Sequence, residues 1–335
     1  MNKLLAVGLL LAGATTATAQ EQASVWYADF DLAAAAAQEQ GKDLLVDFTG
    51  SDWCGWCIKL DEQVFDHEAF LKPAQEKFIL LKLDFPNGEE AIAAVPNPKR
   101  NEELQGKYKV GGFPTVLLMT ATGEVFGQTG YEDMTPEEYV ANLAKLSSEG
   151  KAAIKAVKEL VAQYQTAEDK LSIVKLAIDQ LGKNADKPGA EQLADLARKI
   201  FTLDPENKHM LAVSTLQALV DAGLTTKSDF ALAQKYDAKN ENGLIEGFLK
   251  GALSNLASLD DVAAFVAMAE DFYALGNIKD KEFVGAAFTN AAYFCNQHLD
   301  RLEDAKTWAK RAKEVGGLDE DMLKLLDSIL TPDAS

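Results

Sequence analysis

Cysteine and histidine are both scarce in this chain, with three residues of each among 335. Three cysteines cannot build the disulfide framework of a small secreted scaffold, so the fold must depend on a hydrophobic core. The histidines are scattered, without paired helical spacing or a surrounding carboxylate motif, so none is assigned a catalytic role. A structural zinc needs about four ligands, and outside one close cysteine pair the chain offers only Cys295, His67, His209 and His298. No metal site is therefore expected.

Positive charge is also in short supply. The chain has 33 Lys and Arg residues against 52 Asp and Glu residues, which gives a formal net charge of -19. An acidic surface repels phosphate backbones and anionic lipid, so nucleic acid and membrane surfaces are poor partners. The acidic residues are spread along the chain rather than gathered in one tail, which indicates a solvated acidic surface.

Long apolar runs are absent except near the N-terminus. A lysine at position 3 precedes an apolar run from Leu4 to Leu11, and small residues follow at Ala17-Thr18-Ala19. This order is typical of a secretory signal peptide, and the run is too short to span a bilayer. We predict a signal peptide over residues 1–19 and a mature protein that starts near Gln20. The short signal and the absence of an Asn-x-Ser/Thr sequon favour export to a bacterial periplasm or to the medium.

Strand and helix signals alternate over residues 20–148. Continuous apolar runs at Leu44–Phe48 and Phe78–Asp84 predict buried strands, because strands covered on both faces lack polar alternation. Val116–Met119 and Glu124–Gln128, separated by a turn that contains glycine, predict a hairpin. This order indicates an α/β domain in which helices flank a mixed central sheet.

Turn and cap residues predict several boundaries in this domain. Asp31 is expected to cap a first helix that ends at Gly41. The segment Phe85–Arg100 is rich in proline and glycine and is expected to be a loop. Thr135–Glu138 predicts a helix start with a capping box and a proline at the first helical position.

The remaining residues, 149–335, have few strand signals. Helical periods of about fifteen residues recur between cap signals, and about nine or ten helices are expected. Among them are helices over Ala153–Tyr164, after Asp204-Pro205, and from Ser258 to Gly276. Helix hairpins of this length predict an all-helical domain built as a stacked array. Leu302–Val315 resembles the second helix of a tetratricopeptide-type unit, although the full signature is missing.

The close cysteine pair lies in the run Trp53-Cys54-Gly55-Trp56-Cys57. It follows the predicted strand 44–48 and precedes the amphipathic segment Ile58–Glu62, so both cysteines fall in the first turn of a helix. Exposed backbone N–H groups and the helix dipole favour a thiolate there. We expect an exposed Cys54 sulfur at the mouth of the helix and Cys57 about one turn inside. That geometry suits a nucleophile and a resolving thiol.

Two alternatives to redox chemistry are weaker. A structural disulfide stabilises more when it closes a longer loop, and a bridge across two residues constrains the unfolded chain little. A metal site would need ligands that no second cysteine pair supplies. The third cysteine, Cys295, lies on an apolar helix face beside Tyr293 and Phe294 and is expected to be a buried, inert thiol.

Residues 24–148 resemble the thioredoxin superfamily. The matching features are Val46-Asp47-Phe48 on the strand, the Trp-Cys-Gly-Trp-Cys motif, Lys82-Leu83-Asp84, and Gly112-Phe113-Pro114-Thr115 before the hairpin. The sequence is similar to exported, thioredoxin-like proteins that carry the run Phe-Thr-Gly-Ser-Asp-Trp-Cys-Gly-Trp-Cys. The resemblance implies a thioredoxin fold whose redox-active dithiol works without a bound cofactor.

The resemblance also implies roles for individual residues. Cys54 attacks a substrate disulfide to form a mixed disulfide, and Cys57 resolves it. Pro114 is cis and lies against the cysteine pair, where nearby backbone pairs with an extended substrate chain. The expected substrate contacts are Trp53, Gly55, Trp56, Phe113 and Thr115.

Asp47 is implied to be the buried carboxylate behind Cys57, with Lys82 as its neighbour on the adjacent strand. Resolution needs a deprotonated Cys57, and a buried thiol resists ionisation, so a nearby base that exchanges its proton through water is useful. The alternative for Asp47 is a strand-end carboxylate that only caps a turn. The alternative for Trp53, which would shield the pair, is simple core packing.

Two positions depart from the family pattern. Trp56 stands where thioredoxin has proline, so the redox potential cannot be carried over. Phe113 precedes the cis-proline, where smaller residues are common, and a ring there narrows the substrate groove or offers an aromatic contact.

The sequence therefore predicts an exported thiol–disulfide oxidoreductase that acts on protein disulfides as a reductase or isomerase. A membrane electron-transfer protein is a candidate partner, and the helical domain would bind clients, dock that partner or form a homo-oligomer. The alternative is a chaperone-like binding module in which the helical domain holds clients and the thioredoxin unit is an accessory. A narrow reductant for metal-site or haem-thiol assembly is a third, minor option.

Overall fold

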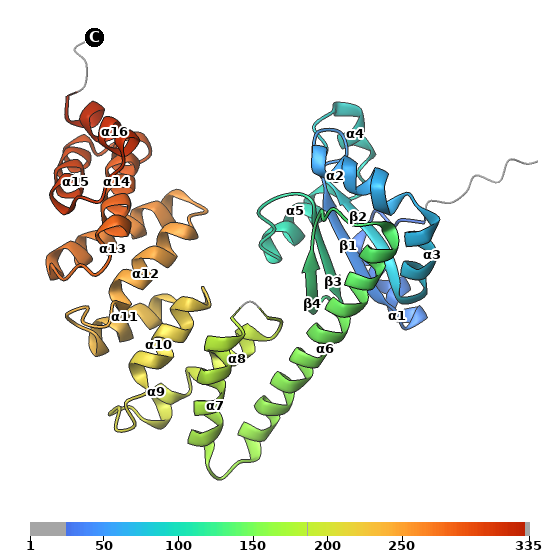
Figure 1. Ribbon diagram of the computed structural model, residues 1–335, viewed down its shortest axis with the longest axis horizontal. Coiled ribbons are helices and arrows are strands. Elements are labelled where there is room, and N and C mark those ends of the chain that lie inside the picture. The colour runs from blue at the N-terminus through green and yellow to red at the C-terminus, as the bar shows by residue number, and fades with distance from the viewer. Residues whose placement is uncertain (1–24, 186, 332–335) are drawn as a thin grey trace, which may run out of the picture. The chain divides into compact units, whose positions relative to one another are not determined.

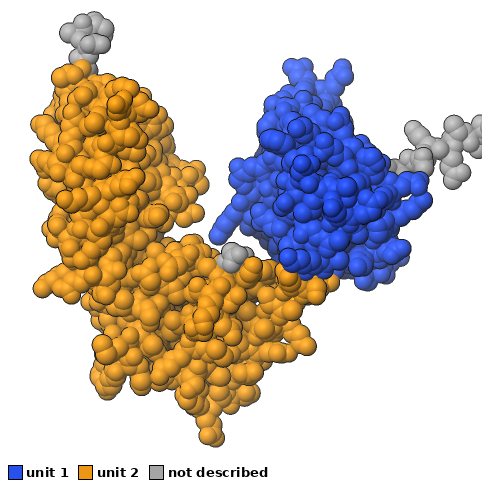
Figure 2. Space-filling view, viewed as in Figure 1, with its two compact units in different colours: residues 1–147 blue, residues 148–335 orange. Residues whose placement is uncertain are grey.

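The structure, a computed structural model, describes residues 25–185 and 187–331. The chain divides into two compact units, Met1–Ser147 and Ser148–Ser335 (Figures 1 and 2). The predicted boundary after residue 148 lies beside this division, and the predicted signal peptide lies outside the described residues. Each unit has its own hydrophobic core.

A four-stranded mixed sheet forms the centre of the first unit, in the order β2-β1-β3-β4. Its strands are β1 (Asp43–Thr49), β2 (Phe78–Asp84), β3 (Thr115–Met119) and β4 (Val125–Thr129). β2 pairs with β1 in parallel, whereas β3 pairs with β1 and β4 with β3 in antiparallel fashion. The mixed sheet expected from the sequence is confirmed. Its central strand is buried on both faces, which explains why β1 shows no polar alternation.

Helices cover this sheet. They are α1 (Phe30–Gln40), α2 (Gly55–Leu60), the π-helix η1 (Asp61–Phe65), α3 (Glu68–Lys77), α4 (Glu89–Ala94), α5 (Pro98–Lys107) and the start of α6 (Pro136–Thr166). Successive side chains of β1 point to opposite faces. Val46 therefore joins a core with Phe30 of α1 and Leu104 of α5, while Asp47 faces the side where Lys82 lies over the Phe65 ring.

The first helix is capped differently from the prediction. Asp29, not Asp31, is the N-cap, and its side chain accepts a hydrogen bond of 3.0 Å from the Leu32 N–H. Both aspartates satisfy the sequence pattern for a cap, so local preference cannot choose between them. The helix ends at Gly41, as predicted, with φ at +64°, a conformation that favours glycine.

The segment Phe85–Arg100, predicted to be a loop, contains α4 and the first turn of α5. The Asp52 carboxylate, 35 residues earlier in the chain, accepts hydrogen bonds from the Asn87 N–H and the Gly88 N–H just before α4. An acceptor at a helix start satisfies backbone donors that would otherwise be left unpaired. This acceptor comes from a distant residue, which the local sequence does not show. The prolines and glycine around α4 therefore led to the wrong prediction of a loop.

The helix that starts after Thr135 is longer than expected. The capping box is confirmed, since Thr135 and Glu138 exchange hydrogen bonds between side chain and backbone. α6 then runs without a break to Thr166, so the separate helix predicted over Ala153–Tyr164 is its second half. Ser147, between the two halves, stays in the helix and donates its hydroxyl to the Leu143 carbonyl.

The second unit is helical over all of its described elements, as predicted. They are α7 (Lys170–Lys183), α8 (Ala190–Ala197), α9 (Ile200–Leu203), α10 (Ala212–Asp221), α11 (Lys227–Tyr236), α12 (Leu244–Ser254), α13 (Leu259–Leu275), α14 (Lys281–Gln297), α15 (Leu302–Val315) and α16 (Glu320–Leu330). Ser258 caps α13 and Gly276 ends it, in agreement with the predicted helix.

One predicted helix start in this unit is wrong. Asp204 does not begin a helix but ends α9. Its carboxylate accepts hydrogen bonds from the Lys208 N–H at 2.8 Å and the His209 N–H at 2.7 Å. A side chain that satisfies nearby backbone donors stabilises a turn in competition with a helix, and the turn forms here.

Two glycines, one inside a helix and one just after a helix, test the helix assignments. Gly182 lies inside α7 with open space around the position of a Cβ, whereas Gly41 has a left-handed φ. We expect Gly182→Ala to raise the free energy of unfolding by about 0.5–1 kcal/mol, because alanine is the better helix former. The control, Gly41→Ala, should lower it by about 1 kcal/mol, since alanine resists the left-handed region. Urea unfolding of both variants, followed by circular dichroism, measures the two effects, and a destabilised Gly182→Ala would contradict the assignment.

Candidate active site

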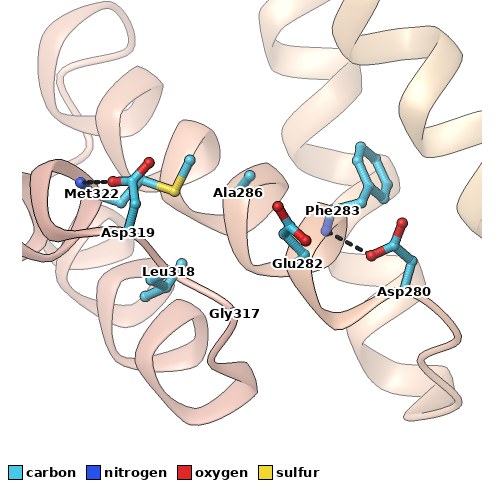
Figure 3. Close-up of a pocket in the computed structure, with 8 residues that line it drawn as sticks. All are labelled: Asp280, Glu282, Phe283, Ala286, Gly317, Leu318, Asp319 and Met322. Carbon is cyan, nitrogen blue, oxygen red and sulfur yellow. Dashed lines mark hydrogen bonds between the residues drawn. The ribbon is translucent and has the colours of Figure 1, made fainter.

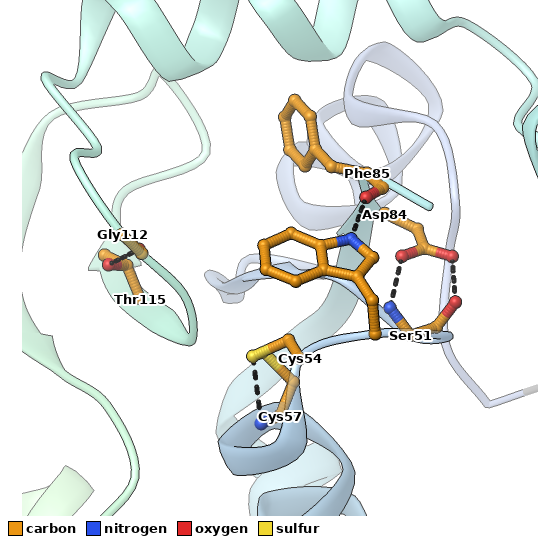
Figure 4. Close-up of a disulfide and its surroundings, with 8 residues drawn as sticks. Ser51, Cys54, Cys57, Asp84, Phe85, Gly112 and Thr115 are labelled. Atoms are coloured by element: carbon orange, nitrogen blue, oxygen red, sulfur yellow. Dashed lines mark hydrogen bonds between the residues drawn. A yellow bond between two sulfur atoms is a disulfide. The ribbon is translucent and has the colours of Figure 1, made fainter. Parts of the chain in front are cut away.

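The cysteine pair lies at the start of α2. Cys54 is the N-cap residue, and its sulfur is joined to the Cys57 sulfur in a disulfide of 2.08 Å (Figure 4). The Cys57 N–H donates a hydrogen bond to the Cys54 sulfur at 3.2 Å. A sulfur in this place accepts from a helix N-terminus, where negative charge is stabilised. The predicted arrangement of Cys54 at the mouth and Cys57 one turn inside is therefore present.

The predicted exposure of Cys54 is wrong for this disulfide form. Cys54 is 6% exposed and Cys57 is 2% exposed. The bond to Cys57 draws the Cys54 sulfur toward the helix, and the exposed neighbours are indole rings. Trp53 is 49% exposed and Trp56 is 56% exposed. Exposed tryptophan surface therefore lies beside the buried disulfide.

Hydrogen bonds tie the loop before α2 to the end of β2. The Asp84 carboxylate accepts from the Ser51 N–H at 2.9 Å and from the Ser51 hydroxyl at 2.6 Å (Figure 4). The Trp53 indole N–H donates to the Phe85 carbonyl at 2.8 Å (Figure 4). Gly50 is required under this ring, because a Cβ there would lie 2.6 Å from the indole. These contacts hold the first cysteine in place relative to the sheet.

Aromatic rings connect this loop with the segment before β3. The Trp53 ring meets Phe113 edge-on with centroids 5.9 Å apart, and Phe113 stacks on Phe85 at 5.0 Å. The Phe113–Pro114 peptide is cis, as expected. Thr115 donates its hydroxyl to the Gly112 carbonyl at 2.7 Å, and Figure 4 shows this segment beside the disulfide. Trp53 is thus exposed beside the cysteines and also packs on Phe113, so simple core packing does not describe it.

The other tryptophan of the motif, Trp56, forms a second aromatic pair. Trp56 contacts Tyr131 with ring centroids 5.0 Å apart, and the Lys59 ammonium lies 4.6 Å from the Trp56 ring centroid. Tyr131 in turn donates its hydroxyl to the Gln63 side chain at 2.8 Å. Gly55 is exposed between the two cysteines. Sequence reasoning identified Trp56 and Gly55 but missed Tyr131, which lies beyond β4 and shows no local signal.

Asp47 lies on β1 with 1% of its surface exposed, and its Oδ1 atom has no hydrogen-bond partner. Burial raises the pKa of Asp47 to about 8, and the nearby Asp61 and Asp84 carboxylates add to this effect, while Lys82 opposes it. The alternative of a strand-end carboxylate that merely caps a turn does not fit, because Asp47 lies within β1 and pairs with both neighbouring strands. The side chain is a buried acid that keeps its proton at neutral pH.

Lys82 lies directly opposite Asp47 in the parallel β1–β2 register. Its ammonium forms an ion pair of 2.5 Å with Asp61 Oδ1 and lies 4.9 Å from the Trp26 ring centroid. Desolvation raises the pKa of Asp61, although Lys82 opposes the shift. Sequence reasoning missed Asp61. The available signal was its position four residues after Cys57, which places both on one side of a helix.

The remaining candidates lie elsewhere. Cys295 is fully buried in α14, and desolvation raises the pKa of its thiol, as expected of an inert cysteine. A pocket of about 660 Å³ opens beside α14 and α16 (Figure 3). Two of its carboxylates, Asp280 and Asp319, accept hydrogen bonds from the first-turn N–H groups of these helices. These two carboxylates are thus helix caps, a third carboxylate, Glu282, also lines the pocket, and no cysteine or histidine does.

The pKa of Asp47 predicts a pH-dependent stability. Between about pH 4 and 8, native Asp47 keeps its proton while unfolded Asp47 loses it, so the free energy of unfolding falls by about 1.4 kcal/mol per pH unit. Asp47→Asn removes this loss, so its free energy of unfolding, relative to that of the wild type, should increase from pH 5 to pH 8. Denaturant unfolding of the oxidised chain at both pH values measures it. The exposed control Asp133→Asn should show no such trend, and an advantage independent of pH would contradict the raised pKa.

Known proteins resemble the first unit. A family model described as Thioredoxin-like matches residues 25–121. Disulfide bond reductase DsbH of Chlamydia pneumoniae is 31% identical over 107 residues, which cover 32% of this chain and 63% of that protein. Thioredoxin-related protein DsbJ of the same organism is 30% identical over 122 residues, which cover 35% of this chain and 34% of that protein. A solved structure named DsbH Oxidoreductase shares 27% identity over 42% of this chain and 95% of that chain, with a TM-score of 0.33.

The chain spans less than two thirds of the length of either curated relative. The matched region contains β1, β2 and β3, both cysteines of the disulfide and the cis-proline. With its mixed sheet and Cys54–Cys57 pair, the region over residues 25–121 is a thioredoxin-like domain, and a long helical region follows it.

Proposed function

We propose that the chain is a thiol–disulfide oxidoreductase that acts on protein disulfides through Cys54 and Cys57. The observation that carries the proposal is the Cys54 sulfur at the N-cap of α2, where the Cys57 N–H donates to it at 3.2 Å. A metal site is not needed for this chemistry, because the disulfide itself carries two electrons. The relative named as a disulfide bond reductase favours the reducing direction over isomerisation.

The reaction starts from the reduced pair. The Cys54 thiolate attacks one sulfur of a client disulfide, a Cys54–client bond forms, and the second client sulfur leaves as a thiolate. Cys57 then loses its proton, and its thiolate attacks the Cys54 sulfur. The Cys54–client bond breaks, the first client sulfur leaves as a thiolate, and the Cys54–Cys57 disulfide forms. Two electrons have passed from the dithiol to the client.

Asp47 is the group that takes the proton from Cys57 in this direction and returns it in the other. The pKa of about 8 suits both tasks, because a proton carrier works best when its pKa lies near the working pH. In the disulfide form Asp47 is protonated at neutral pH. When a donor dithiol reduces the disulfide, Cys57 leaves as a thiolate and Asp47 supplies its proton.

The client chain binds beside the cis-proline. Phe113 and Thr115 flank Pro114, and their backbone groups pair with an extended client segment. Trp53 and Trp56 present exposed indole surface next to the cysteines, which suits apolar client side chains. Gly55 leaves open space between these rings, since nothing lies within 4 Å of a Cβ placed there.

The first 19 residues direct the protein out of the cytoplasm in this proposal, and a membrane electron donor reduces it there. Among the residues that the structure describes, no helix combines the length and the apolar character that a membrane crossing requires. The helical unit is proposed to bind clients, to dock the electron donor or to join two copies of the chain.

Substitution of each cysteine tests the activity. Cys54→Ser and Cys57→Ser should both reduce insulin at the background rate, because each lacks one sulfur of the exchange. Cys57→Ser should also accumulate a mixed disulfide with insulin, visible on a non-reducing gel, since nothing resolves it. The control Cys295→Ser should keep the wild-type rate. Equal activity of Cys54→Ser and the wild type would favour the alternative, in which the helical unit holds clients.

Export is tested by the mass of the protein made in a bacterial host. The periplasmic fraction should contain a chain that lacks residues 1–19, because signal peptidase cuts after small residues. Leu9→Arg, which places a charge in the apolar run, should leave the full-length chain in the cytoplasm. A full-length wild-type chain confined to the cytoplasm would contradict export.

A further inference from the structure

Asp47 and Lys82 are neighbours on adjacent strands but do not form an ion pair with each other. The parallel register places Lys82 directly beside Asp47, and an ammonium on a neighbouring strand is the natural partner of a buried carboxylate. Lys82 instead pairs with Asp61 at 2.5 Å, while Asp47 Oδ1 accepts no hydrogen bond. The cation that could neutralise the buried acid is therefore held by a second acid.

The position of Asp61 depends on the π-helical turn after α2. η1 begins at Asp61, and the Asp61 N–H donates to the carbonyls of Cys57 and Ile58. π-turns inside helices are frequent at functional sites. Lys82 reaches Asp61 across the faces of Trp26 and Phe65, with its ammonium 4.9 Å and 5.9 Å from the ring centroids. The rings favour a cation along this path.

Among the described residues whose charge acts on Asp47, Lys82 is the one that stabilises the ionised carboxylate. Asp84, at the end of β2, is a second carboxylate, and its oxygens accept from Ser51. Tyr139 of α6 is fully buried and donates its hydroxyl to the Gly130 carbonyl, and burial raises the pKa of its phenol. Cys57 lies on α2 in the disulfide.

We propose that Asp61 is a positioning residue that holds the Lys82 ammonium away from Asp47 and so keeps Asp47 protonated for its exchange with Cys57. The inference rests on the proposed function, and it assigns a role to a residue outside the Trp-Cys-Gly-Trp-Cys motif. Asp61 touches neither the client nor the sulfur atoms in this account. It acts through Lys82.

The direction of the effect follows from the charges. Removal of the Asp61 charge frees Lys82 to pair with Asp47 and also takes away a nearby negative charge. Both changes stabilise the ionised Asp47 carboxylate, so both lower its pKa. Asp47 would then lose its proton at a lower pH, and reduction of the Cys54–Cys57 disulfide would slow relative to the wild type above the new pKa.

The pKa of Asp47 can be measured without activity, in the intact oxidised chain. Carbon-13 NMR of labelled aspartate carboxyl groups, assigned by difference with Asp47→Asn, follows its titration. We expect Asp61→Asn to lower the pKa of Asp47 by about one unit or more, and Asp61→Ser, which removes the same charge, to give the same shift if the first variant fails to fold. Asp61→Glu should restore the wild-type value. The exposed control Asp66→Asn should leave it unchanged.

A double-mutant cycle separates positioning from a direct charge effect. In a Lys82→Met background no ammonium remains to be released, so Asp61→Asn should shift the pKa of Asp47 by much less than it does with Lys82 present. Equal shifts in the two backgrounds, or no shift with Lys82 present, would overturn the proposal.

The kinetic consequence is measured separately. The rate at which dithiothreitol reduces the oxidised chain is measured against pH for Asp61→Asn and for the wild type. Above the pKa of Asp47, the ratio of the two rates should fall about tenfold for each unit by which the pKa of Asp47 is lowered. A ratio that stays at one while the pKa moves would overturn the role in proton exchange. An inactive wild-type chain in the insulin assay would overturn the proposed function itself, whatever the carboxylate titration shows.

Discussion

A single backbone N–H that points at a sulfur atom organises the chemistry of this chain. It belongs to Cys57, and its acceptor is the sulfur of Cys54 at the N-cap of α2. This hydrogen bond requires a strand that ends near the sulfur and a fixed loop between that strand and α2. β1 meets the first need. The contacts of Ser51 with Asp84 and of Trp53 with Phe85 meet the second, because they tie the loop to the end of β2.

The same strand carries the second half of the chemistry. Successive residues of β1 point to opposite faces, and Asp47 falls on the face where Lys82 lies over Phe65 rather than in the core of Phe30 and Leu104. A carboxyl group there loses its hydration shell, which is the main reason that its pKa rises. The fold thus combines a site that favours a negative sulfur with one that disfavours a negative carboxylate. In the proposed reaction, the group that transfers protons and the sulfurs that transfer electrons are different side chains, built on one strand and the helix that follows it.

Local signals predicted much of this arrangement. The apolar runs of β1 and β2, the capping box at Thr135 and the cysteine pair at a helix start all act over a few residues, and all are present. Some errors are local, at the N-cap of α1 and at the turn that Asp204 forms. The others concern contacts between distant residues. The Asp52 carboxylate accepts from the backbone just before α4, 35 positions away, and Lys82 is paired with Asp61 across 21 positions. The burial of Cys54 also depends on its bond to Cys57 and on neighbouring rings. No periodicity or cap pattern encodes such contacts, so sequence reasoning identified Asp47 but not Asp61, the ion-pair partner of Lys82.

The cap of α2 has a consequence for the energetics of the whole chain. The atom that caps this helix is the atom that changes oxidation state, so helix stability and redox state form one thermodynamic cycle. A thiolate is a stronger acceptor than a neutral sulfur, and whatever strengthens the cap in the reduced form favours reduction by the same free energy. Any substitution that tightens the first turn of α2 around a charged sulfur would therefore make the protein a stronger oxidant. Selection for a particular potential would act on the backbone of that turn as directly as on the residues between the cysteines.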